Sequence, residues 1–269
     1  MTAAPSPAWE MHLHELPSGT LEVFTMGAGH PLVLLPSLGR GQEDFDGIAP
    51  LLVAGGLRLI RPEPRGIGRS DPLRAGATLH DMAADVIAAM QAERIGPALV
   101  AGHAAGNWVA RIITHARPDL VAGCAMLAAV TGTTVRPEIS AAIAGSFDTD
   151  LPAAERLEHL RRGYFAPGND ASVWLEGWHK DVALAQRAAR EATTDRAWLR
   201  AAENRPLLYV AAAEDAIAAP PSEDELRDAL GPQVTRVVID RAGHALLPEQ
   251  PEATAAALVA FARRIFSAA

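Results

Sequence analysis

The fold of this chain is constrained most by an alternation between short apolar runs and longer amphipathic stretches. The apolar runs are rich in Leu or β-branched residues, as is typical of buried strands. They cover Leu21–Thr25, Leu32–Pro36, Arg58–Arg61, Ala98–Ala101, Gly123–Ala128, Pro206–Ala211 and Thr235–Ile239. Amphipathic helical patterns follow over Leu79–Glu93, Trp108–His115 and Pro251–Phe266. Apolar strands separated by helices predict an α/β fold, with a mostly parallel sheet covered by helices on both faces.

The first two candidate strands are joined by an unusually short link. Leu21–Thr25 and Leu32–Pro36 are separated by a segment that contains Gly27–His30, with two glycines. A short glycine-containing link between two strand patterns is typical of a β-hairpin. The sequence therefore predicts that these two strands pair and form an antiparallel edge of the sheet.

One long segment breaks the alternation. From about Thr131 to Asn204 the chain is helical in pattern, polar, and poor in strand-like runs, and it carries Trp174, Trp178 and Trp198. We expect this segment to be a helical cap inserted between two strands. The predicted organisation is a core domain of residues 1–130 and 205–269 and a cap subdomain of residues 131–204.

Composition limits the classes of partner. The net charge is −8 among 269 residues, and the basic residues do not cluster, which disfavours binding to nucleic acid or an anionic membrane. No apolar run is long enough to span a bilayer, and the N-terminus lacks a signal-peptide pattern. The single cysteine, Cys124, lies in an apolar run and is expected to be a buried hydrophobe. We expect a cytoplasmic protein that binds a small-molecule substrate; its oligomeric state is left open.

Two glycines mark a strained turn at the centre of the chain. The strand Ala98–Ala101 runs into Gly102–Gly106, and a helical pattern begins directly afterwards. In such a strand–turn–helix the backbone is strained and the helix packs close to the strand, so side chains at Gly102 and Gly106 would clash. The central residue, Ala104, is then presented at the tip of the turn, above the carboxyl ends of the strands.

Two later segments place an acid and a histidine at the same edge. Asp215 follows the strand Pro206–Ala211, and His244 follows the strand Thr235–Ile239. The order of turn, acid and histidine is the order found in enzymes with a G-x-S-x-G nucleophile elbow. The central residue of the elbow is alanine here, where those enzymes carry serine.

These motifs together resemble the α/β-hydrolase superfamily over essentially the whole chain. Leu34–Gly39 resembles the oxyanion loop, and Arg61–Ser70 resembles the D-x-R-G-x-G-x-S segment, with Glu63 in place of the usual Asp. Ala242–His244 and Pro248–Glu252 match the usual surroundings of the catalytic His. The resemblance implies an α/β-hydrolase fold, with the Arg61–Ser70 loop bracing the site.

The resemblance also implies roles for individual residues. Asp215 would hold the tautomer of His244, and the backbone N–H groups of Leu38 and Ala105 would form an oxyanion hole. Ala104 stands at the nucleophile position, where a methyl group cannot attack a carbonyl carbon. Relatives that use a carboxylate nucleophile at this position are excluded for the same reason.

The alanine leaves several functions open. It is either an engineered replacement of serine or the residue of a natural lineage without the nucleophile. The leading hypothesis is a hydrolase of a small ester-, lactone-, amide- or carbamate-like substrate, in which His244 and Asp215 activate water. The alternatives are proton abstraction by the same dyad, as in a lyase, cyclase or cofactor-free oxygenase, and a pseudoenzyme that only binds a ligand.

Four further side chains are candidates for substrate binding. Ser37 either lines the site beside the oxyanion loop or serves as a turn residue. His103 either acts as a second base or packs beneath the elbow, and packing is the favoured interpretation. Trp174 and Trp178 lie four residues apart on one helical face, where they either wall the pocket or pack within the cap.

The sequence indicates no metal or cofactor. His12 and His14 share one face of a possible N-terminal strand, a spacing that can bind metal, but no third ligand lies nearby in the sequence. We therefore expect a solvated strand edge there. Gly66–Gly68 lacks the remainder of a dinucleotide fingerprint, so no nucleotide cofactor is expected.

Overall fold

An eight-stranded sheet forms the centre of the computed structural model, which describes residues 8–130 and 135–267. The strands are β1 (Glu10–Leu16), β2 (Gly19–Met26), β3 (His30–Leu35), β4 (Leu57–Pro62), β5 (Ala98–His103), β6 (Val121–Leu127), β7 (Leu207–Ala212) and β8 (Val234–Ile239). Their order across the sheet is β1-β2-β4-β3-β5-β6-β7-β8. The pairs β1–β2 and β2–β4 are antiparallel and the others are parallel. The prediction of a mostly parallel sheet is confirmed.

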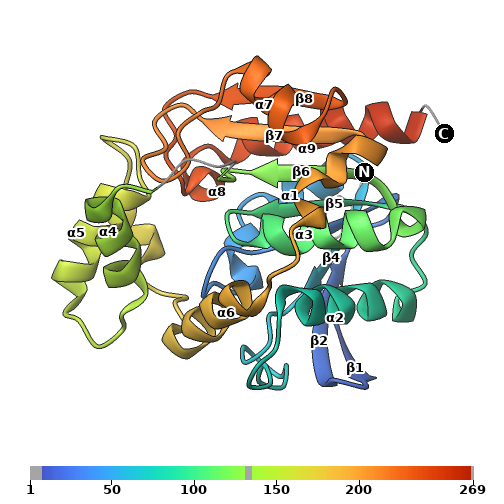
Figure 1. Ribbon diagram of the computed structural model, residues 1–269, viewed down its shortest axis with the longest axis horizontal. Helices are drawn as coiled ribbons and strands as arrows, with labels where there is room; N and C mark the ends of the chain where they lie inside the picture. Colours follow the sequence, from blue (N-terminus) through green and yellow to red (C-terminus); the bar gives the residue numbers. More distant parts are fainter. Residues whose placement is uncertain (1–7, 131–134, 268–269) are drawn as a thin grey trace, which may run out of the picture.

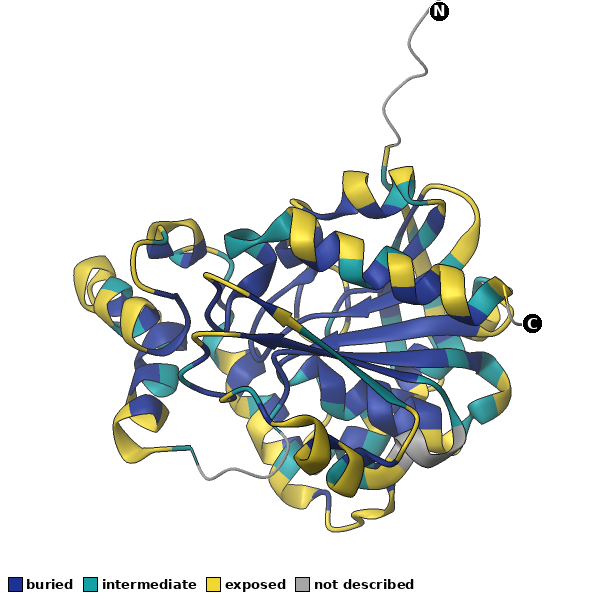
Figure 2. Ribbon diagram, turned by 90° about the horizontal axis from the view of Figure 1, so that it is seen from above, coloured by how far each residue is buried: buried dark blue, intermediate teal, exposed yellow. Residues whose placement is uncertain are grey.

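Helices cover both faces of the sheet, as predicted (Figures 1 and 2). One face packs against α2 (Leu79–Ala92), α3 (Gly106–Ala116) and α7 (Glu223–Leu230). The other face packs against α1 (Ala49–Ala54), α8 (Leu246–Glu249) and α9 (Pro251–Ser267). Short 3-10 turns, η1 (Gln42–Phe45) and η2 (Pro118–Leu120), join these elements. Every residue of β5 and β7 is buried, which explains why these runs are apolar throughout instead of alternating.

Local sequence signals determine where several helices begin. Thr78 caps α2: its side-chain oxygen accepts from the Asp81 N–H, and the Asp81 carboxylate accepts from the Thr78 N–H. Ser222 and Glu225 form the same reciprocal pair at the start of α7. Such capping boxes satisfy N–H groups that the first helical turn leaves unpaired.

The predicted hairpin between the first two candidate strands is wrong. β2 and β3 do not pair, because β4 lies between them in the sheet. The antiparallel edge exists, but β1 and β2 form it, and β2 then pairs with β4. The glycine link instead crosses the amino end of β4, where the His30 N–H donates to the carbonyl of Gly56. Gly29 has φ +118°, and a Cβ there would lie 2.1 Å from the Gly56 oxygen, so only glycine fits this crossing.

The segment between β6 and β7 forms a helical layer beyond the carboxyl ends of the parallel strands (Figure 1). It contains α4 (Pro137–Phe147), α5 (Ala153–Gly163), η3 (Ala171–Trp174) and α6 (Lys180–Ala192), and we refer to residues 135–192 as the cap helices. A separate apolar cluster holds them over the sheet edge. The following turn, η4 (Ala197–Asn204), returns to the core, where Trp198 is fully buried beside α3.

The rim of the sheet beside the cap helices is braced by a buried ion pair. Arg65 contacts both carboxylate oxygens of Asp85, at 2.8 and 2.9 Å, and its third nitrogen donates to the Thr20 carbonyl at 2.6 Å. Nearby, the Glu63 carboxylate accepts from the Gln42 N–H at 3.1 Å, and burial raises the pKa of Glu63 to about 7. This arrangement agrees with a bracing role for the Arg61–Ser70 loop. Among the described residues, no helix combines the length and the apolar character that crossing a membrane requires.

Replacement of Gly29 by alanine tests the crossing over β4. We expect Gly29→Ala to lower the free energy of unfolding by about 3 kcal/mol, because the backbone conformation is disfavoured for alanine and the added methyl meets the Gly56 carbonyl. Gly47→Ala is the control, since a Cβ at Gly47 meets no atom within 4 Å. Urea unfolding of both variants measures the difference; equal stabilities would contradict this account of the crossing.

Candidate active site

A tight turn joins β5 to α3 and presents Ala104 to a cavity. Ala104 has φ +45°, a left-handed conformation that is uncommon for residues other than glycine. A Cβ at Gly102 would lie 2.3 Å from the carbonyl carbon of Gly106, and a Cβ at Gly106 would lie 2.4 Å from the Leu35 oxygen. Both glycines are therefore required for the close approach of α3 to the sheet, as the sequence pattern indicated.

The structure brings His244 and Asp215 together at this edge. His244 Nδ1 lies 2.9 Å from Asp215 Oδ2 and 3.1 Å from Oδ1, and both side chains are buried. Asp215 Oδ1 also accepts the N–H groups of Ile217 and Ala218, each at 2.8 Å. The carboxylate is thus fixed by backbone donors and accepts the Nδ1 hydrogen of the imidazole. Nε2 of His244 remains the nitrogen that can take a proton.

His103 lies beneath the turn and away from the cavity. It is fully buried, and its Nε2 donates to the backbone carbonyl of His244 at 2.8 Å. Burial, together with the smaller effect of the nearby His244, lowers the pKa of His103 to about 3. The ring is therefore neutral and holds the loop that carries His244, which agrees with packing and not with a second base. His103 does not contact the cavity, which differs from the expectation that it binds substrate.

The two residues whose backbone N–H groups are expected to form the oxyanion hole lie at the same cavity. Leu38 and Ala105 both line it, and neither N–H donates to an acceptor in the described part of the chain. Ala105 immediately precedes α3, so its N–H belongs to the unpaired, electropositive end of that helix. These donors are free to bind an oxygen that gains negative charge.

The cavity beside Ala104 has a volume of about 250 Å³. Ser37 and His244 line it together with Leu38, Ala104 and Ala105. Core residues and cap residues complete the lining: Asn107, Trp108, Ala128, Val130, Val135, Ser140, Ile143, Tyr164, Arg187 and Ile217. The cavity is therefore mostly apolar, with a few polar groups at its edges, as is usual for a small-molecule site.

Trp174 and Trp178 do not line the cavity, which differs from the prediction that they wall the pocket. Their rings lie 5.9 Å apart at 87°, and the guanidinium of Arg40 lies 4.8 Å from the centre of each ring. Arg40 in turn donates to Asp44 at 2.9 Å. The two tryptophans therefore hold the loop after β3 against the cap helices through cation–π contacts. Packing within the cap was the favoured interpretation of their spacing, but the two residues do not share a helical face, because η3 ends at Trp174.

Two further cap residues line the cavity, and sequence patterns missed one of them, Arg187. Tyr164 follows α5 and is buried, which raises its pKa to about 12, so the hydroxyl keeps its proton. Arg187, on α6, lies at the cavity edge, 5.9 Å from the ring of Phe147, and no carboxylate pairs with it within residues 8–130 and 135–267. No local motif marks either residue, because the cap sequence has no spacing tied to chemistry.

The chain belongs to the alpha/beta hydrolase family, whose match covers residues 32–257. This assignment rests on most of the chain and agrees with the sheet order and with the turn between β5 and α3. The resemblance inferred from the sequence motifs is confirmed, and so is the α/β-hydrolase fold.

Relatives of known name include hydrolases and haloperoxidases. BpoC of Mycobacterium tuberculosis, a candidate non-heme bromoperoxidase, is 28% identical over 250 residues, covering 87% of this chain and 94% of BpoC. Its crystal structure superposes with a TM-score of 0.78 and 25% identity, over 94% of this chain and 99% of that one. The (E)-2-((N-methylformamido)methylene)succinate hydrolase of Acinetobacter baylyi is 31% identical over 110 residues, 40% of this chain and 41% of that protein.

The buried His103 predicts a specific dependence of stability on pH. The pKa of His103 is about 6.5 in the unfolded chain and lower in the folded one. The contribution of neutral His103 to the free energy of unfolding is therefore complete above pH 6.5 and is lost as pH falls toward 3. His103→Gln keeps a donor for the His244 carbonyl but cannot titrate. The free energy of unfolding should fall between pH 7 and pH 5 in both proteins. We expect the fall to be about 2 kcal/mol larger in the parent than in the variant. Urea titrations at both pH values measure this; parallel losses would show that His103 does not resist protonation.

Proposed function

We propose that this protein hydrolyses a small ester-, lactone-, amide- or carbamate-like substrate with water activated by His244 and Asp215. The observation that carries the proposal is the geometry of the dyad: His244 Nδ1 lies 2.9 Å from a carboxylate fixed by backbone donors, and His244 lines the same cavity as Ala104. A base oriented in this way needs only a bound water and a polarised carbonyl group to act.

The reaction can be derived from these groups. Nε2 of His244 removes a proton from a water molecule, and the resulting hydroxide attacks the carbonyl carbon. Asp215 stabilises the imidazolium that forms, and the N–H groups of Leu38 and Ala105 bind the oxyanion. When the tetrahedral intermediate collapses, the imidazolium Nε2–H donates its proton to the leaving oxygen or nitrogen. One oxyanion donor contributes about 10²- to 10³-fold to the rate of such reactions.

Ala104 determines which route is open. A methyl group cannot form an acyl-enzyme, so hydrolysis must proceed by direct attack of water. Alanine is also smaller than serine by one oxygen atom, which leaves space beside His244 for the attacking water. This route applies whether the alanine arose naturally or by engineering; an engineered origin would make the parent a serine hydrolase with residue 104 as its nucleophile.

The cap helices suggest the character of the substrate. We infer that the cap helices act as a substrate-selecting cap, because Tyr164 and Arg187 extend the cavity lining beyond the core. An apolar cavity with one unpaired guanidinium at its edge favours an apolar substrate that carries a carboxylate. The Acinetobacter baylyi relative hydrolyses a substituted succinate, which also supports an anionic substrate.

A second function uses the same dyad without hydrolysis. Because no nucleophile stands at position 104, His244 is equally placed to abstract a proton from a bound carbon acid, as a lyase, cyclase or cofactor-free oxygenase requires. A ligand-binding pseudoenzyme is less well supported, because binding alone gives no reason to retain a carboxylate-oriented histidine. Exchange of solvent deuterium into a bound carbon acid distinguishes proton abstraction from ester hydrolysis.

Three proteins test the serine-free mechanism on a panel of short chromogenic esters and carboxylate-bearing esters. We expect the parent protein to turn over at least one ester and His244→Ala to lose about 10²- to 10⁴-fold in kcat/KM, because general base catalysis contributes this much. Ala104→Ser should bring no gain and should not react with a fluorophosphonate probe. Activity and labelling confined to Ala104→Ser would instead identify a serine hydrolase that lacks its nucleophile.

Replacement of Arg187 tests the anionic substrate. For a carboxylate-bearing ester we expect Arg187→Leu to raise KM about 10- to 100-fold with little change in kcat, since a hydrogen bond to a charged group contributes about 1.5–3 kcal/mol. The uncharged amide analogue of the same ester should be unaffected. Arg162→Leu, on the exposed surface of α5, is the control. Equal losses on charged and uncharged esters would contradict carboxylate recognition.

A further inference from the structure

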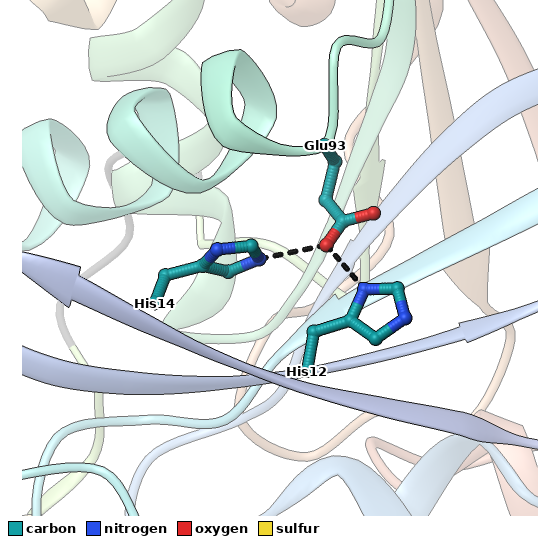
Figure 3. A group of neighbouring side chains, drawn as sticks. All are labelled: His12, His14 and Glu93. Atoms are coloured by element: carbon teal, nitrogen blue, oxygen red, sulfur yellow. Dashed lines mark hydrogen bonds and ion pairs between the residues drawn. The ribbon is translucent and has the colours of Figure 1, made fainter.

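A second group of titratable side chains lies at the far edge of the sheet, on β1. His12 and His14 project from one face of this strand toward Glu93, the residue that ends α2 (Figure 3). Glu93 is 81 residues from His12 and 79 from His14 along the chain. The prediction of a solvated edge without a third ligand is therefore wrong, because folding brings a carboxylate to both rings.

The three side chains converge on one point. Nδ1 of His12 lies 2.6 Å from Glu93 Oε1, and Nε2 of His14 lies 2.7 Å from the same oxygen. All three candidate ligand atoms lie within 4.8 Å of one another. The Glu93 side chain is only 4% exposed, whereas those of His14 and His12 are 19% and 37% exposed. The group is thus anchored on the carboxylate side and accessible to solvent on the histidine side.

We propose that His12, His14 and Glu93 form a binding site for a divalent transition-metal ion, Zn²⁺ in particular. Two imidazoles and one carboxylate are a donor set that zinc takes in sites with an open fourth position. Ligand atoms around a tetrahedral Zn²⁺ lie about 3.3 Å apart, given bonds of about 2.0–2.1 Å. The nitrogen atoms must therefore move away from Oε1 by about 0.6–0.7 Å, and ligand atoms that are now up to 4.8 Å apart must approach one another, which side-chain rotations on an edge strand allow.

The surroundings of Glu93 fix the orientation of its carboxylate. The Nη2 atom of Arg58 lies 3.3 Å from the other oxygen, Oε2, so the guanidinium orients the carboxylate and leaves Oε1 to the histidines. The carboxylate also stands at the carboxyl end of α2, where the helix dipole favours a positive charge.

The metal would act as a clamp between two elements. Among the described residues, β1 is an edge strand that pairs only with β2, so no described strand holds its outer side. An ion shared by β1 and the end of α2 would fix this edge to the helical layer. None of the three ligands lines the cavity beside Ala104, so the role is stabilisation of the fold and not catalysis at that cavity.

Metal titration of the full chain, prepared without a histidine tag and stripped with EDTA, tests the site. We expect one Zn²⁺ per chain by competition with a chromophoric chelator, and one Co²⁺ with visible d–d absorption. When the free Zn²⁺ concentration is about one hundred times Kd, Zn²⁺ should raise the Tm of the protein by about 5 °C or more.

Substitution of the proposed ligands tests whether these residues bind the metal. His14→Gln and Glu93→Gln should each weaken Zn²⁺ binding by more than about tenfold and abolish the rise in Tm, because even an outer partner of a zinc ligand contributes roughly 10- to 100-fold. His115→Gln, exposed at the end of α3, is the matched control and should bind as the parent does. If His14→Gln or Glu93→Gln fails to fold, His12→Gln, at the most exposed of the three ligands, is measured in its place. Undetectable binding, or equal weakening in His115→Gln, would overturn the proposal.

Discussion

The close approach of α3 to β5 is the constraint on which the rest of the active site depends. Gly102 and Gly106 leave no room for a Cβ, and Ala104 is held at φ +45° as a result. A left-handed conformation costs a residue with a side chain about 1–2 kcal/mol, and glycine would avoid this cost. The chain nevertheless keeps a methyl group at this position, directed at the cavity that His244 also lines. The turn therefore retains the geometry of a nucleophile elbow without the hydroxyl group.

The cap helices and the oxyanion loop are coupled through adjacent residues of α6. The Gln186 side chain accepts the Gly39 N–H at 2.8 Å, and Arg187, the next residue, lies at the cavity edge. The Gly39 carbonyl accepts the His179 N–H at 2.9 Å from the start of the same helix. Because Gly39 directly follows Leu38, a substrate that moves α6 would also move an expected oxyanion donor. In the proposed function, substrate selection by the cap would thus be mechanically linked to stabilisation of the oxyanion.

The residues that sequence patterns identified are those whose chemistry is encoded locally. Asp215 and His244 each follow a strand directly, so the pattern of strands predicted that they would meet at one edge. Pairing between strands is not encoded in this way: the glycine link after β2 resembles a hairpin, yet β4 is inserted between β2 and β3. Arg187 and Glu93 could not be identified for the same reason. The residues that surround each of them in the fold come from segments distant in sequence, and no periodic pattern connects these segments.

The two carboxylate–histidine groups differ in the hydrogen-bond donors that each carboxylate already binds. Asp215 Oδ1 already accepts two backbone N–H groups, so this carboxylate is saturated with donors and can only orient a buried imidazole. Glu93 accepts no backbone donor in the described part of the chain, and its Oε1 atom contacts only imidazole nitrogens. Those nitrogens are partly exposed, so their hydrogens can be lost to water and replaced by an ion. This difference in donors is the reason that we propose proton transfer for the first group and metal binding for the second.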